Sequence, residues 1–258
     1  MNETPLLSHL IELRNRLVWC VAVLAAAFVV CYFFAKPIYG FLVEPLARIL
    51  AAKGGNHAMI FTQLTEAFFT YLSVALWAAF FVTSPFILIQ LWKFIAPGLY
   101  EHERKMFLPY LLATPVLFLA GASLAYYAVF PAAWSFFLSF ETPAGPGGLP
   151  IQLQARVGDY LSLAMSLILA FGFSFELPLA LVLMVHAGMI QVTDLRRFRR
   201  YAIVTAFIVA AIFTPPDVLS QLSLAIPLCL LYEAAIIAAG FVEKARITAK
   251  EREETQAS

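Results

Sequence analysis

One carboxylate stands out because it lies in a long apolar stretch. Glu176 is the single Asp, Glu, Lys or Arg between Tyr160 and Thr193. Placing an ionised carboxylate near the middle of a bilayer costs roughly 3 kcal/mol or more, so such a residue usually meets a partner or water. Glu176 is therefore a candidate intramembrane polar site. The alternative is a position near the membrane surface, or a neutral acid bonded between helices, since Pro178 frees a backbone carbonyl nearby.

The patterns that usually carry intramembrane catalysis are missing. His102-Glu103 lacks the second histidine that a helical zinc site needs. The chain has no Gly-x-Ser-Gly nucleophile motif, no paired aspartates within a span and no phosphate-binding glycine loop. Cys20, Cys31 and Cys229 all fall in apolar stretches and are interpreted as packing residues. We expect no enzyme activity, no cofactor, no metal and no nucleic-acid partner.

Composition predicts a polytopic helical membrane protein. Hydrophobic residues make up 62% of the 258 residues, charged residues 13%, and the mean hydropathy is +0.84. A soluble chain of this length carries far more charge, so the exterior is expected to face the lipid bilayer. The fold class is all-α with six transmembrane helices, expected at about 17–35, 67–91, 108–131, 160–184, 201–215 and 218–239.

The fifth expected span is short. Only about 15 residues separate Arg200 from the break at Thr214-Pro215-Pro216-Asp217. Crossing the hydrocarbon core takes about 20 helical residues, so this span requires local thinning of the bilayer. Six crossings place both termini on one side, and thirteen of the 17 Lys and Arg residues fall on that side. The positive-inside rule therefore predicts cytoplasmic N- and C-termini.

Several local features refine this scheme. Residues 4–16 predict an amphipathic helix that leads into the first span, with Thr4 as its cap and Pro5 at its first position. Residues 38–50 form a short apolar segment that Pro45 is expected to interrupt. Prolines 109, 115 and 131 predict a kinked third span. Residues 1–242 are expected to form a single domain, and the charged tail 243–258 is expected to be disordered.

Four motifs then occur in order among these spans. They are HLIELRNR at residues 9–16, FIAPGLYEHER at 94–104, FGFSFELP at 171–178 and TPPDVLSQ at 214–221. Together they make the chain resemble the TatC family, the polytopic core of the twin-arginine protein translocase, from about Leu7 to Phe241.

The resemblance implies a six-helix, glove-shaped receptor in the bacterial cytoplasmic (inner) membrane. Such a receptor recognises folded cargo with an Arg-Arg signal peptide and assembles with single-span partners of the TatA and TatB kind and with other copies of itself. The proton-motive force drives the transport. By resemblance, Glu12 and Glu103 meet the two signal arginines.

The chemistry of arginine agrees with this role for Glu12 and Glu103. A guanidinium is always charged and pairs with carboxylate in a two-pronged fork, and both glutamates are expected at the same membrane face. The local alternative is that Glu12 pairs with Arg16 and Glu101 with Lys105, each contributing about 0.3–0.5 kcal/mol.

Further residues are implied in supporting roles. A cytoplasmic surface beside the two glutamates comprises Arg16, Phe94, Pro97, Leu99, Tyr100 and Glu101, some of which also suit a helix break and interfacial anchoring. Outer-loop contacts with partners or neighbouring copies are implied for Pro45, Pro215, Asp217 and Gln221. A second class of function stays open at this point, a proton- or ion-coupled transporter of small solutes that uses Glu176.

Overall fold

The computed structural model describes residues 5–53, 58–95, 108–142, 148–149, 151, 153–214 and 217–257. Apart from two isolated β-bridges, the regular structure in these ranges is helical, which confirms the all-α fold class. The elements are α1 (Pro5–Phe33), α2 (Ala35–Lys53), α3 (Glu66–Ile95), α4 (Leu108–Leu124), the π-helical η3 (Ala125–Val129), α5 (Phe130–Leu138), α6 (Val157–His186), α7 (Val192–Phe213) and α8 (Val218–Ala257).

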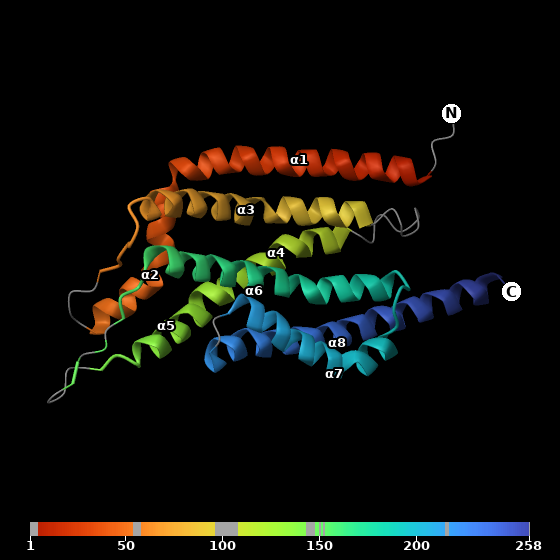
Figure 1. Cartoon of the computed structure of the whole chain (residues 1–258). Helices are drawn as coiled ribbons and strands as arrows, with labels where there is room; N and C mark the ends of the chain where they lie inside the picture. The colour runs from red at the N-terminus through yellow and green to blue at the C-terminus, as the bar shows by residue number, and fades with distance from the viewer. Residues whose placement is uncertain are drawn as a thin grey trace. The chain divides into compact units, whose positions relative to one another are not determined.

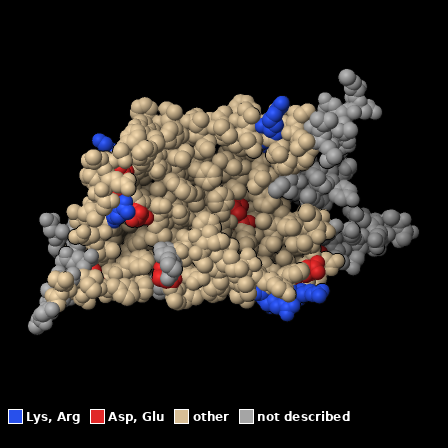
Figure 2. All heavy atoms as spheres, viewed as in Figure 1, with Lys and Arg blue, Asp and Glu red and all other residues tan. Residues whose placement is uncertain are grey.

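Five helical stretches within the described ranges are long and apolar enough to cross a membrane. They are His9–Phe33, Glu66–Phe94, Leu112–Leu138, Val157–His186 and Ser220–Lys244. These match five of the six expected spans within a few residues at most ends. The remaining span lies in α7, whose first turns carry four arginines, so its crossing stays a prediction. Most of the surface in view bears neither acidic nor basic side chains, as a lipid-facing exterior requires (Figure 2).

α1 and α3 lie side by side, and small residues hold them together (Figure 1). α1 begins at Pro5 and runs without a break into the first span, as the sequence predicts. Buried Cys31, Ala35, Ala75 and Ala79 form a cluster against which larger residues such as Phe28 pack. Small side chains let helix backbones approach closely where lipid provides no hydrophobic driving force.

Pro45 does not interrupt its segment, so that prediction is wrong. α2 continues through the buried Pro45 from Ala35 to Lys53. A proline inside a helix leaves the carbonyl four residues earlier without its usual N–H donor, here the carbonyl of Phe41. The hydroxyl of Tyr126 donates to that carbonyl oxygen at 2.7 Å. The hydroxyl of Tyr160 donates to the next carbonyl oxygen, that of Leu42, at 2.8 Å.

The third span contains a widened turn. α4 passes into the π-helical η3 and then α5, which has a proline, Pro131, in its first turn. Pro131 lacks an N–H group and its ring crowds the carbonyl of the preceding turn, which a wider π turn relieves. The irregularity expected from the three prolines is therefore located at residues 125–129.

The helices group into two compact units. One comprises Met1–Leu111 with Tyr126–Ser166, and the other comprises Leu112–Ala125 with Leu167–Ser258. The boundaries fall inside α4, η3 and α6, so each unit takes pieces from separate parts of the chain. The single domain expected from the sequence stays a prediction.

The charged tail is helical up to Ala257, which contradicts the expectation of disorder beyond residue 243. α8 continues from its apolar part through the tail. The tail is rich in Ala, Glu, Lys and Arg, which have high helix propensity, and a helix already formed adds residues without a new nucleation cost.

Candidate functional site

Glu12 is tied into a polar cluster where the first half of α1 meets the end of α3. Arg16 donates from Nε to Glu12 Oε1 at 3.0 Å, and its Nη2 contacts the same oxygen. Arg16 also reaches across to α3, where its Nη1 donates to Gln90 Oε1 at 2.9 Å. The local Glu12–Arg16 pair considered in the sequence is thus present, and it is part of a larger contact between two helices.

An aromatic contact completes this cluster. The imidazole of His9 stacks on Phe94, with ring centroids 4.2 Å apart and an interplanar angle of 13°. His9 Nδ1 lies 4.0 Å from Glu12 Oε2. We call His9, Glu12, Arg16, Gln90 and Phe94 the Glu12 cluster. The sequence indicated Glu12, Arg16 and Phe94, whereas Gln90 was missed because its role depends on a residue 74 positions away.

The Glu12 carboxylate keeps capacity for a further cation. Its side chain is 37% exposed, while that of Arg16 is 23% exposed. An ionised carboxylate offers about four acceptor positions, of which Arg16 uses only those on Oε1. Arg16 and His9 therefore orient the carboxylate without covering it. Glu103, its expected partner, lies outside the described residues, as do Pro97, Leu99, Tyr100 and Glu101.

Glu176 is buried in α6, with 6% of its surface exposed. Neither carboxylate oxygen has a hydrogen-bond partner of normal geometry among the described residues. The fully buried Thr114 of α4 is a polar neighbour. An unsatisfied buried polar group costs about 1–3 kcal/mol. The role of Glu176 as an intramembrane polar site stays a prediction.

Two glycines explain how α4 approaches α6 near Glu176. A Cβ on Gly121 would lie 2.4 Å from the carbonyl oxygen of Phe171, and one on Gly172 would lie 2.6 Å from the ring of Phe118. At Gly121 the clash is with backbone, so a larger residue would push α4 away from α6. At Gly172 a Cβ would require the Phe118 ring to shift. The two glycines thus permit close packing of α4 on α6.

Asp217 and Gln221 have intramolecular partners at the connection between α7 and α8. Asp217 Oδ1 accepts the backbone N–H of Ser220 at 2.7 Å, which caps the start of α8. Gln221 Nε2 donates to the carbonyl oxygen of Phe207 at 3.3 Å. The structure thus brings these two predicted residues together, while Pro215 lies outside the described part of the chain. Their contacts with partners stay a prediction.

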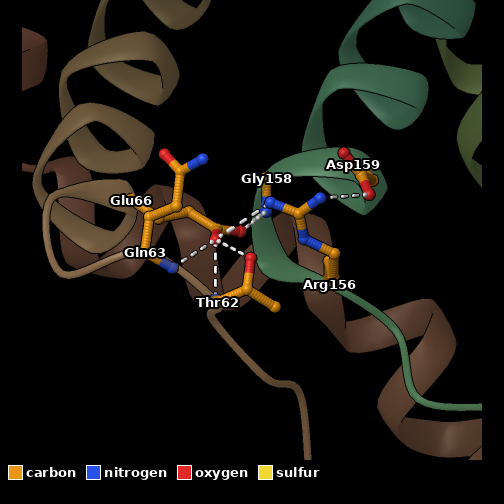
Figure 3. A network of polar contacts seen from close by, with 6 residues as sticks. All are labelled: Thr62, Gln63, Glu66, Arg156, Gly158 and Asp159. Atoms are coloured by element: carbon orange, nitrogen blue, oxygen red, sulfur yellow. Dashed lines mark hydrogen bonds and ion pairs between the residues drawn. The ribbon is translucent and has the colours of Figure 1, made fainter.

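A second polar network, absent from the sequence predictions, closes the loop before α3 (Figure 3). Glu66 Oε2 accepts the backbone N–H groups of Thr62 at 2.8 Å and Gln63 at 3.3 Å, and Arg156 Nη2 at 3.2 Å. Arg156 Nη1 lies 3.6 Å from Asp159 Oδ2. A threonine and a glutamate just before a long apolar run are a capping signal that could have indicated half of this network.

The backbone around this network is also paired. The N–H of Ile60 donates to the carbonyl oxygen of Ala155 at 3.1 Å, and the N–H of Val157 donates to that of Ile60 at 3.0 Å. Only 9% of the Glu66 side chain is exposed. The loop is therefore fastened to the start of α6 by main-chain and side-chain bonds together.

The described helices are long and apolar and carry polar clusters at their ends, and one of them holds a buried carboxyl group. These features define a polytopic helical membrane protein. Within the described residues no group of three or more His, Cys, Asp or Glu side chains is placed to hold a metal ion. Comparison with known proteins narrows the class further. The family model described as "Sec-independent protein translocase protein (TatC)" matches residues 8–227.

Individual relatives agree with the family model. The TatC protein of Magnetococcus marinus is 46% identical over 254 residues, covering 98% of this chain and 90% of the relative. That of Escherichia coli K12 is 40% identical, covering 92% and 88%. A crystal structure of the "Twin Arginine Translocase Receptor- TatC" aligns with a TM-score of 0.79 at 36% identity, covering 91% of this chain and 99% of that one. The chain belongs to the TatC family.

Proposed function

We propose that this chain is the core receptor subunit of a twin-arginine translocase, and that Glu12 and Glu103 bind the two arginines of the signal peptide. The observation that carries the proposal is the Glu12 carboxylate, which is held by Arg16 yet remains 37% exposed. An oriented carboxylate suits the fork geometry of a guanidinium, because less side-chain freedom is lost on binding.

The wider role follows from the family. The subunit lies in the bacterial cytoplasmic membrane with both termini cytoplasmic. It assembles with TatA- and TatB-type single-span proteins and with other copies of itself, and the proton-motive force drives export of folded cargo. In this proposal, partner helices attach at Glu176 and at the α7–α8 connection. Coupled transport of a small solute through Glu176 is the competing function, and it predicts no dependence on Glu12.

The experiment is crosslinking of an Arg-Arg signal peptide to membranes that contain each variant at matched levels. Glu12→Ala and Glu103→Ala are each expected to weaken crosslinking at least about tenfold, since losing a charge-assisted hydrogen bond costs about 1.5–3 kcal/mol. Lysine at either position is expected to be worse because it repels the signal. Replacing both signal arginines by lysine should also weaken binding, because an ammonium cannot make the fork contact.

Glu44→Ala provides the matched control. Glu44 accepts a bond from Arg48 Nε at 3.1 Å with the same spacing of four residues along a helix, but it lies on α2. Crosslinking should be unaffected by this change. Full crosslinking to the Glu12→Ala/Glu103→Ala double variant would contradict the proposal.

A further inference from the structure

A basic concavity of about 450 Å³ lies between α7 and α8, which run side by side (Figure 1). Arg196 and Arg199 of α7 and Lys244 of α8 line it. The apolar side chains of Ile236, Ile237 and Phe241 complete the lining. Three cations beside an apolar wall form a surface that suits a ligand with an anionic head and a hydrocarbon part.

Three acidic groups lie nearby, and each accepts a hydrogen bond. Glu233 Oε2 accepts Arg199 Nη2 at 2.8 Å, which neutralises one of the three cations. Asp194 Oδ2 accepts the backbone N–H of Gln191 at 3.1 Å, and Glu243 Oε1 accepts that of Val192 at 3.5 Å. These bonds leave the carboxylates charged, but the four arginines of α7 together with Lys244 outnumber Asp194, Glu233 and Glu243 by two. Among the described residues, Arg196 and Lys244 make no ion pair, so the surface around the concavity is positive.

The concavity lies at the level where lipid headgroups are found. Lys244 is the last residue of the apolar span Ser220–Lys244. The exposed Tyr201 follows the four arginines of α7, and the Arg200 guanidinium lies over its ring at 4.8 Å. Tyrosine and arginine gather at membrane–water interfaces, where the ring is half in hydrocarbon and the charge is in water.

The apolar wall is open to a neighbour. Phe241 is 71% exposed and Ile237 is 62% exposed. Gly240 also lines the concavity, and a Cβ added there would meet no atom within 4 Å. The space above Gly240 is thus large enough for a foreign group, and it can be filled by mutation without a clash.

We propose that this concavity binds one anionic phospholipid. Arg196 and Lys244 hold its phosphate group, and an acyl chain lies on Phe241 and Ile237. Basic recesses between membrane helices bind anionic headgroups by this combination of charge and apolar contact. The bound lipid would fasten the end of α8 to α7 from the membrane side.

Native mass spectrometry of the purified, delipidated full chain tests the proposal, with palmitoyl-oleoyl phosphatidylglycerol as the probe and the matching phosphatidylcholine as the neutral comparison. Arg196→Gln/Lys244→Gln is expected to lower phosphatidylglycerol affinity about 25-fold, at about fivefold for each cation near an anionic headgroup. The control Arg197→Gln/Arg200→Gln removes the same charge from α7 residues that do not line the concavity. Its effect should stay below about fivefold.

A second pair of variants keeps every charge. Gly240→Leu is expected to displace phosphatidylglycerol by filling the recess, whereas Gly40→Leu on α2, where a Cβ also meets open space, should leave binding unchanged. Equal losses in the two charge variants, equal binding of phosphatidylcholine, or an unaffected Gly240→Leu would each overturn the proposal. Competition by millimolar inorganic phosphate would show a free-anion site instead.

Discussion

Glu12 and Glu176 carry the same carboxyl group in opposite surroundings. Glu12 is exposed, oriented by Arg16 and able to bind a further cation. Glu176 is buried in α6, with the hydroxyl of Thr114 as a polar neighbour among mainly apolar residues. An exposed carboxylate is suited to a charged ligand from water, whereas a buried one favours a neutral hydrogen bond from within the membrane.

For Glu176 we predict an order of export activity among substitutions. Gln retains much of the activity because it still donates and accepts, Asp is intermediate because its reach is shorter, and Ala loses most. The loss in Glu176→Ala is expected to be about five- to thirtyfold, the equivalent of about 1–2 kcal/mol. Export of a folded reporter at matched membrane levels measures it. A dead Gln variant beside an active Asp variant would show that the residue must exchange a proton.

At the scale of elements, side-chain hydroxyls donate hydrogen bonds to the backbone carbonyls that prolines leave without an N–H donor. Tyr126 supplies the donor that Pro45 cannot offer to the carbonyl of Phe41. In α3 the donor comes from the same helix. The hydroxyl of Ser84 donates at 2.6 Å to the carbonyl oxygen of Phe81, four residues before Pro85. Bilayer hydrocarbon contains no water to satisfy such carbonyls, so a protein donor is needed.

A double-mutant cycle tests this account of α2. Tyr126→Phe is expected to lower the free energy of unfolding by about 1–3 kcal/mol, because it leaves the Phe41 carbonyl unsatisfied. In a Pro45→Ala background the restored N–H serves that carbonyl, so the same change should cost less than about 1 kcal/mol. Unfolding in detergent gives both values. Tyr127→Phe, at an exposed neighbouring residue, is the control, and strictly additive effects would contradict the account.

At the scale of the whole molecule, α7 sets how the chain fits the bilayer. Its apolar part begins at Tyr201 and the helix ends at Phe213, whereas a crossing needs about 20 residues. Thr214 Oγ1 donates to the carbonyl oxygen of Ala210 at the end of α7, and Asp217 caps the start of α8. We infer that the membrane thins here and that single-span partners dock at the thinned region.

Lengthening α7 tests this inference. Four added residues of Leu and Ala after Val204, about one turn, extend the helix by about 6 Å and relieve the mismatch. Co-purification of TatA- and TatB-type partners is then expected to fall about fivefold or more, since mismatch costs fractions of a kcal/mol per Å. The same four residues inserted after Lys250, outside the predicted spans, form the control. Undiminished partner recovery with intact export would argue against the inference.

While the roles of Glu12, Glu103 and Glu176 stay predictions, the amino-acid sequence by itself determined the class of protein, five of the spans and the start of α1 at Pro5. These follow from composition, apolar run length and capping preferences, which act within a few residues. The tertiary structure decided whether Pro45 breaks a helix, what Arg16 holds and where Arg156 binds. The hydrogen bonds that decide these points join residues 85, 74 and 90 positions apart, and only packing brings such groups within hydrogen-bond distance.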